Sequence, residues 1–261
     1  MIHEAAARGF AQAADAYERG RPGYPPEAVE RLCEAVGIGP GRAVLDLAAG
    51  TGKLTRLLVM TGAELVAVEP VEQMRAALAR ALPEVTALAG TAEDVPLPAA
   101  SVDAVVAGSA FHWFRGEEAL AEIHRVLRPD GRLGLLWNVR DESVPWVAEL
   151  TAIMEPYRGA APGYRSGAWR DAFRRTALFS PLRHAEFRHV HRLGPEAVVA
   201  RVASVSFVAA LAESDRAAVL AGVRALLARD PATRGREVVD LPYRTDVWWC
   251  AVVSPRGGGR R

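Results

Sequence analysis

The sequence predicts a doubly wound α/β domain with a mostly parallel sheet, and three observations lead to this prediction. An apolar run at 44–47 is followed by a small-residue turn and a helical pattern, which together make a strand–turn–helix unit. A second apolar run at 65–68 ends in an acidic residue, at the distance expected for the next parallel strand. Further apolar runs alternate with amphipathic helical patterns up to position 137, as in sheets covered by helices on both faces.

The composition narrows the classes of protein to consider. The chain has 261 residues, 50% hydrophobic and 24% charged, which suits one domain of this class with an insertion. A net charge of +1 predicts no nucleic-acid partner. Since there is neither a long apolar run nor an apolar signal-peptide core, we expect a cytoplasmic protein without a membrane span. Cys33 and Cys250 stand far apart without ligand spacing, so we expect reduced thiols and no metal site.

The residues before the first strand are predicted to form a separate segment, 1–36. Two prolines at 25–26 indicate a turn or a helix start, and an amphipathic helix follows over 27–36. The aromatic and basic residues upstream either pack on the sheet or close over a ligand, because the segment has no strand of its own. Tyr17 and Arg21 are therefore candidates for a lid over the site.

The turn after the first strand has the composition of a nucleotide-binding loop. Gly50 and Gly52 allow positive φ and a close approach of the backbone to a ligand. The helix that begins near Leu54 would present its unpaired N–H groups to the same ligand. A phosphate-binding P-loop is excluded because Leu54 follows Lys53 where Ser or Thr is needed. A dinucleotide fingerprint would need a third glycine where Thr55 stands.

The second strand ends in Glu69 and Pro70, 23 residues after Asp46. An interval of about 20 residues is typical of a βαβ nucleotide unit, whose strand-end carboxylate binds ribose hydroxyls. The alternative for Glu69 is a helix N-cap. Pro70 is expected at the first helical position, where its missing N–H costs nothing, followed by a helix over 71–82.

The third and fourth strands are predicted at 84–88 and 102–107. The fourth ends in an aromatic cluster around His112, at the sheet edge where open α/β folds bind ligands. A neutral imidazole with a pKa of about 6.5 can act there as a general base. Alternatively, His112 is hydrogen-bonded to the backbone, and the aromatic rings form core and cofactor wall. Trp113 is expected to line the site.

A helix and a strand are predicted after the aromatic cluster. An amphipathic helix at 117–127 leads through a Pro-Asp-Gly turn to a fifth strand at 132–137. Because Asn138 follows this strand directly, it lies at the ligand edge of the predicted sheet and is a candidate for contact with an acceptor.

The second half of the chain is more loosely patterned. Residues 142–181 collect aromatic side chains and are predicted as a helical cap inserted into the fold. A sixth strand is expected at 182–193 and a last one at 244–253. Between them we expect two helices over 196–229, with a break at Ser214-Asp215.

An arginine-rich stretch lies between Arg158 and Arg192, with eight arginines against two acidic residues. A guanidinium binds carboxylate or phosphate through two parallel hydrogen bonds, so Arg165, Arg170 and Arg174 could select an anionic acceptor. The alternative is a solvated helix face. RNA binding is a third option, which no recognition module supports.

The motif Asp46, Ala48, Gly50, Gly52 resembles that of class I S-adenosylmethionine (SAM) methyltransferases, which have an acidic residue, Gly or Ala, and two glycines at alternate positions. Ala48 at the first of these positions costs some backbone freedom. The stretch from Tyr17 to Pro25 also resembles the N-terminal segment of a small-molecule subgroup similar to trans-aconitate methyltransferases. The resemblance is strong over 44–138 and looser elsewhere.

This resemblance implies a seven-stranded Rossmann-like sheet, SAM as the cofactor and methyl transfer to a small-molecule acceptor. The adenine would be held by the Ala92 backbone and the Glu93 side chain, with Asp94 as the competing acid. The resemblance implies the following cofactor-binding residues: Asp46, Ala48, Gly50, Thr51, Gly52, Glu69, Pro70, Met74, Ala92, Glu93, Ser109, Tyr17 and Arg21. The alternatives are a SAM-binding protein that does not transfer methyl, and an NAD-dependent oxidoreductase, which Thr55 opposes.

These observations divide the chain into five parts. They are an N-terminal lid segment and helix (1–36), a SAM-binding core (37–141), a helical cap (142–181), C-terminal strands and helices that complete the sheet (182–255), and a disordered tail (256–261).

Overall fold

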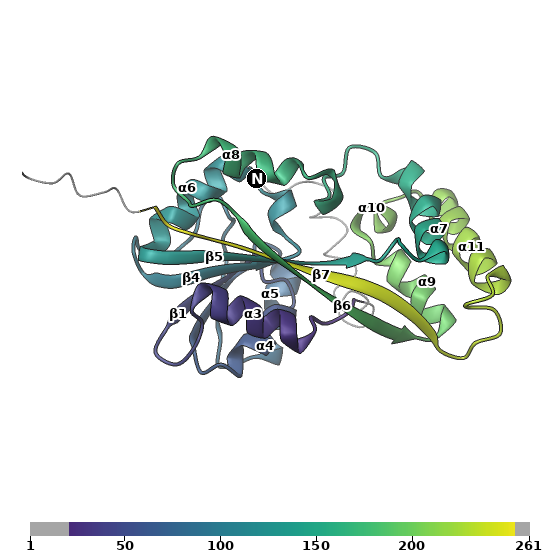
Figure 1. Cartoon of the computed structure of the whole chain (residues 1–261), viewed down its shortest axis with the longest axis horizontal. Helices are drawn as coiled ribbons and strands as arrows, with labels where there is room; N and C mark the ends of the chain where they lie inside the picture. The colour runs from purple at the N-terminus through teal and green to yellow at the C-terminus, as the bar shows by residue number, and fades with distance from the viewer. Residues whose placement is uncertain (1–20, 254–261) are drawn as a thin grey trace, which may run out of the picture.

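The structure is a computed structural model that describes residues 21–253 (Figure 1). Over these residues the chain forms a seven-stranded sheet in the order β3-β2-β1-β4-β5-β7-β6. Only β7 runs antiparallel to its neighbours. The strands are β1 Ala43–Leu47, β2 Glu64–Val68, β3 Thr86–Leu88, β4 Val102–Gly108, β5 Leu127–Arg140, β6 Arg183–Leu193 and β7 Val239–Ala251. The predicted doubly wound, mostly parallel fold is confirmed.

Helices cover both faces of this sheet (Figure 1). On one face lie α3 (Pro26–Val36), α4 (Lys53–Val59) and α5 (Glu72–Ala81). On the other lie α6 (Gly116–Val126) and the short α8 (Asp171–Arg175). The helices predicted at 27–36 and 117–127 are confirmed to within one residue at each end.

One predicted helix start is wrong. Helix α5 begins at Glu72, so Pro70 lies before the helix and not at its first position. The reason is local: the backbone N–H of Val71 donates to the Glu69 side chain at 2.9 Å, and Val71 is held in an extended conformation. The helix therefore begins two residues later than it would with Pro70 at its first position.

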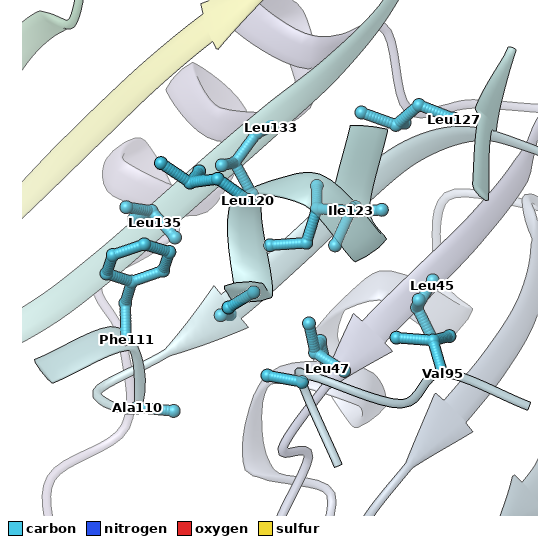
Figure 2. Close-up of a cluster of buried hydrophobic side chains, with 14 of the residues drawn as sticks. Leu45, Leu47, Val95, Ala110, Phe111, Leu120, Ile123, Leu127, Leu133 and Leu135 are labelled. Atoms are coloured by element: carbon cyan, nitrogen blue, oxygen red, sulfur yellow. The ribbon is translucent and has the colours of Figure 1, made fainter. Parts of the chain in front are cut away.

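The hydrophobic core between α6 and the sheet is formed by residues that recur with the period of the helix and of the strand (Figure 2). Leu120 and Ile123, three residues apart on the helix, are fully buried. They face the sheet, where Leu133 and Leu135 alternate along β5 and are also fully buried. Burying each of these side chains contributes about 1.5–3 kcal/mol, so this layer fixes α6 and the loop before it.

A second group of helices gathers at the far end of β6 and β7 (Figure 1). It consists of α7 (Pro145–Met154), α9 (Pro195–Ala203), α10 (Ser206–Ala209) and α11 (Glu213–Arg229). We call these four helices the helical unit. They share one apolar core with the start of β7, which includes the fully buried Tyr243.

The helical unit differs from the predicted cap. The segment 142–181 is helical as expected, but only α7 joins the unit, whereas Trp169 and Ala172 pack into the core under α6. The segment 196–229 forms three helices, and the predicted break at Ser214-Asp215 falls inside the first turn of α11. Acidic side chains are favourable at a helix N-terminus, so this pair starts a helix where a break was predicted.

The last strand is longer than predicted, because β7 begins at Val239 and pairs along the whole length of β6. The longer pairing aligns Arg140 of β5 with Tyr243 of β7 and His189 of β6 in one cross-strand row. Paired residues point to the same face of a sheet, so these three side chains lie together next to the helical unit. Among residues 21–253, no helix is long and apolar enough to cross a membrane.

Candidate active site

A cavity opens at the carboxyl ends of β1 and β4. The strand order reverses between these two strands, and ligands of open α/β sheets bind at such a point. Its lining residues come from the turn after β1, from the ends of β4 and β5, from α9 and from the start of the described chain: Arg21, Pro22, Tyr24, Asp46, Ala48, Ala49, Gly50, Thr51, Lys53, Leu54, Gly108, Ser109, Asn138 and Arg201.

The turn after β1 adopts a left-handed backbone at three alternate positions. The φ angle is 56° at Ala48, 59° at Gly50 and 84° at Gly52. Gly52 has no room for a side chain, since a Cβ atom would lie 3.0 Å from the Leu78 Cγ atom. A Cβ atom on Gly50 would lie 3.9 Å from the Met74 sulfur, so Met74 flanks the turn from α5. The two glycines therefore give the open backbone that was predicted at this position.

Asp46 carries an unusual buried carboxylate at the base of the cavity. The residue has no exposed surface, and its Oδ2 atom accepts a hydrogen bond from the Thr55 hydroxyl at 2.7 Å. Its Oδ1 atom has no partner among the described residues. Burial raises the pKa of Asp46 to about 7, against the Thr55 hydrogen bond and with a smaller contribution from Glu69. Thr55 stands where a dinucleotide fingerprint would need its third glycine, and its side chain thus has a structural role in holding Asp46.

Glu69 ties the turn to the end of β2. Its Oε2 atom accepts from the Gly50 N–H at 2.8 Å, and its Oε1 atom accepts from the Val71 N–H at 2.9 Å. The residue is 5% exposed, and burial raises the pKa of its carboxyl while the two N–H groups lower it. Each carboxylate oxygen can accept more than one hydrogen bond, so both can still accept a hydrogen bond from a ligand. The N-cap alternative for Glu69 is wrong, because Val71 is the N-cap residue of α5 and no side chain caps this helix.

The loop after β3 separates two neighbouring acids. Ala92 is buried, and the Glu93 carboxylate accepts a hydrogen bond from the backbone N–H of Arg115 at 2.9 Å. Asp94 is exposed, while its backbone pairs with that of Thr91. Glu93 is therefore the acid held toward the start of α6, and Asp94 points to solvent.

The start of the described chain crosses the mouth of the cavity. The Tyr24 hydroxyl lies 3.3 Å from the Ser109 Oγ atom, and it would lie 2.7 Å from a Cβ atom on Gly108. The Lys53 ammonium donates to the Arg21 carbonyl at 3.1 Å. The structure thus brings Arg21 and Ser109 together at the cavity. Tyr17 lies outside the described residues.

Asn138 holds this segment in place. Its Nδ2 atom donates to the carbonyls of Pro22 and Gly23, at 3.3 and 3.0 Å. Its Oδ1 atom accepts from the Thr245 hydroxyl at 2.6 Å. Asn138 was predicted to contact the acceptor, but both ends of its amide bond to the protein itself. The sheet edge position was correct, and the partner was not foreseeable from the sequence.

His112 is in the neutral form with its proton on Nε2. The indole N–H of Trp137 donates to its Nδ1 atom at 3.1 Å, and an indole nitrogen can only donate. Nδ1 must therefore carry the lone pair. Burial, followed by the nearby charges of Arg21 and Arg158, lowers the pKa of His112 to about 3. The Trp113 ring lies beside it, with centroids 5.1 Å apart. His112 thus offers a hydrogen-bond donor, and action as a general base would break its bond to Trp137.

Most of the predicted acceptor-selecting arginines serve other roles. The guanidinium of Arg170 lies over the rings of Trp169 and Trp248, at 4.6 and 4.5 Å from their centroids. Arg174 pairs with an acid of its own helix, and Arg165 pairs with Glu142. Arg201 of α9, which is 8% exposed, lines the cavity together with Arg21, and sequence reasoning missed it. Its helical period gives no signal that it faces a cavity.

Among the described residues, no group of three or more His, Cys, Asp or Glu side chains could hold a metal ion.

Comparison with known proteins assigns the chain to a family. Residues 45–135 match the family model described as a methyltransferase domain. An uncharacterized methyltransferase of Mycobacterium tuberculosis is 43% identical over 90% of this chain and 92% of its own length. An uncharacterized methyltransferase-like protein of Schizosaccharomyces pombe is 35% identical over 88% of this chain and 90% of its own.

Solved structures agree with the sequence relatives. A structure named as a type II methyltransferase from Anaeromyxobacter dehalogenans is 27% identical, with a TM-score of 0.64 over 88% of this chain and 97% of that chain. A methyltransferase of an antibiotic biosynthesis pathway from Anabaena variabilis, at 21% identity, has a TM-score of 0.63 over 88% of this chain and 98% of its own. The second likeness shows the fold alone. By its domain and by relatives that span nine-tenths of its length, the chain belongs to the class I SAM-dependent methyltransferases.

Proposed function

We propose that this protein transfers a methyl group from SAM to a small-molecule acceptor bound between the turn after β1 and the helical unit. The observation that carries the proposal is the pair of buried carboxylates around the turn. Asp46 has an unpaired oxygen at the cavity, and Glu69 holds Gly50 at the end of β2. A phosphate-binding site would not place two acids there, since they would repel the ligand.

These residues fit the chemistry of SAM. The unpaired Oδ1 atom of Asp46 would accept a hydrogen bond from the ammonium group of the cofactor, which favours the ionised carboxylate. The remaining lone pairs on Glu69 would accept the two ribose hydroxyls. Ala92 and Glu93 would hold the adenine, and Thr51, Pro70 and Met74 would flank the turn. The open backbone at Gly50 lets the ligand approach without meeting a side chain.

When bound, SAM supplies a methyl group activated by a positively charged sulfur. The protein has to hold the acceptor in line and to exclude water. Tyr24 and Asn138 keep residues 21–24 across the cavity mouth, and this supports a role for Arg21 in closing the site. We propose that the Nε2–H group of His112 donates to an oxygen of the acceptor, while Trp113 walls the site.

The segment over the cavity supports the finer assignment to the subgroup similar to trans-aconitate methyltransferases, which has such an N-terminal segment. We propose a SAM-binding core at 37–141. In this proposal, 142–181 and the helices within 182–255 form the acceptor side of the site.

Calorimetric titration with SAM, with S-adenosylhomocysteine (SAH) and with NAD tests the cofactor assignment. The wild type should bind SAM and SAH, and NAD negligibly. Glu69→Ala should lose about 1.5–3 kcal/mol of binding, since hydrogen bonds to a charged group have this value. Glu64 lies on the same strand and is exposed, so Glu64→Ala is the matched control and should bind as the wild type does. Unchanged affinity in Glu69→Ala would remove this residue from the site, and tight NAD binding would refute the cofactor.

A further inference from the structure

Two arginines near the cavity make no ion pair with a carboxylate of the described residues. Arg140 is the half-buried last residue of β5, and the charged groups that shift its pKa are Tyr243 and three arginines (201, 165 and 158). Arg140 helps to lower the pKa of Glu155, but that carboxylate is exposed and is ion-paired with Arg158. Arg201 is 8% exposed, its Nη1 atom reaches only the Ser204 hydroxyl at 3.5 Å, and its Nε atom has no partner in the described chain. A buried charge is costly unless it is paired, so these two cations are incomplete without an anion.

Two polar groups near these arginines also lack hydrogen-bond partners among the described residues. Tyr243 pairs with Arg140 across β5 and β7, is 1% exposed, and its hydroxyl has no hydrogen-bond partner among the described residues. His191 lies beside the Tyr243 ring, with centroids 6.4 Å apart, and its Nδ1 atom also has no partner in the described part of the chain. Burial and the charge of Arg201 lower the pKa of His191. The surroundings of Arg140 thus contain polar groups that have no hydrogen-bond partner among the described residues.

One member of this cluster lines the cavity, and a neighbouring arginine also acts on His112. Arg201 lines the cavity together with Asp46 and Gly50. Arg158 acts electrostatically on both Arg140 and His112. The cluster therefore borders the part of the site that we assign to the acceptor, on the side of the helical unit.

We propose that Arg140 and Arg201, with the Tyr243 hydroxyl, form a binding site for a carboxylate group of the methyl acceptor. This inference rests on the proposed function and names its substrate class. A guanidinium binds a carboxylate through two parallel hydrogen bonds, and a phenol adds a third donor. The cofactor has a carboxylate of its own, which is the other source of the same chemistry. We assign the site to the acceptor, because Arg140 lies beyond the residues that line the cavity at the turn.

The test uses calorimetry on the full-length protein saturated with SAH, with citrate, succinate and inorganic phosphate as probes. Dimethyl succinate is the neutral match for succinate. The wild type should bind at least one carboxylate probe and not the ester, and binding should weaken as salt screens the charges. Binding of phosphate in preference to both carboxylates would overturn the assignment of the ligand class, and binding of none of the three anions would overturn the site.

The variants are Arg140→Gln, Arg201→Gln and Tyr243→Phe, with Arg216→Gln on the exposed face of α11 as the control. The two arginine variants should weaken the carboxylate probe about 10- to 100-fold, and Tyr243→Phe less, with SAH affinity within about twofold of the wild type. If the arginine variants weaken SAH and spare the probe, the carboxylate belongs to the cofactor and the proposal is wrong. Thermal melting shows that each variant is folded. If the wild type fails to bind SAH, the proposed function fails, and titration of the probes into the ligand-free protein still decides the anion site.

Discussion

Replacing Asp46 by asparagine should change how the stability of the protein depends on pH. In the folded protein the pKa of Asp46 is raised to about 7, mainly by burial, from an ordinary value of 3.8. The folded state therefore holds a proton on Asp46 between these two values, where the unfolded chain has released it. Stability contributed by this proton is present at low pH and is lost as the pH rises through the window. The amide of the Asp46→Asn variant would keep an oxygen for the Thr55 hydroxyl and has no proton to lose.

The magnitude follows from the shift. One pKa unit corresponds to about 1.36 kcal/mol, so a rise from 3.8 to about 7 is worth up to about 4 kcal/mol. The free energy of unfolding of the wild type should thus fall, relative to Asp46→Asn, by about 1.4 kcal/mol per pH unit within the window. Below about pH 4 and above about pH 7 the difference between the two proteins should become constant.

Urea denaturation of both proteins at several pH values between about 4 and 8 measures this difference, and other titrating groups cancel in the comparison. Parallel curves for wild type and Asp46→Asn would refute the idea that a protonated, buried Asp46 lies at the base of the cavity. Calorimetry in buffers of different ionisation heat adds an independent test. At about pH 6, binding of SAH should release a proton from wild-type Asp46, because the ammonium group favours the carboxylate.

Three further predictions concern single residues. Ala48→Gly should raise the free energy of unfolding by about 1 kcal/mol in urea melts, because Ala48 has a φ of 56°; a loss of stability would contradict this. Because the pKa of His112 is about 3, the rate of methyl transfer should show no titration step from this residue between about pH 6 and 8. His112→Gln should mainly raise the KM for the acceptor. A titration step that is present in the wild type and lost in the variant would show that His112 is a general base after all. Asn138→Ala removes two hydrogen bonds to the carbonyls of residues 22–23. Hydrogen exchange of the backbone amides in this segment, measured by mass spectrometry, should become faster, and Thr245→Val should have a smaller effect. Equal exchange in wild type and Asn138→Ala would show that Asn138 does not anchor the segment.

The cofactor half of the fold could be predicted because its signals are local. Apolar runs define β1, β2 and β4, and the glycines of the turn are needed for backbone angles that other residues rarely adopt. Spacing along the chain predicted Glu69 at the end of the second strand, but its hydrogen bond with the Gly50 N–H was not predicted. The predicted position of Pro70 was wrong in this half. The hydrogen bond from the Val71 N–H to the Glu69 side chain outweighed the preference of proline for the first position of a helix.

The acceptor side could not be predicted in the same detail, because its geometry depends on contacts between distant segments. Arg201 faces the cavity because α9 packs on the start of β7 in a core shared by four helices. Arg140 and Tyr243 meet through the antiparallel register of β5 and β7, which no local pattern encodes. The arginine-rich stretch was recognised, but its ion pairs and ring contacts place most of its charges elsewhere.

The most direct test of the central claim is transfer of a labelled methyl group. The protein is incubated with SAM that carries a trideuterated methyl group and with a panel of small carboxylates, amines and alcohols, and the products are measured by mass spectrometry. A labelled product should form with the wild type, together with SAH, and its rate at subsaturating SAM should fall in Glu69→Ala and not in Glu64→Ala. Binding of SAM without a labelled product from any acceptor class would contradict methyl transfer and leave a protein that only binds the cofactor.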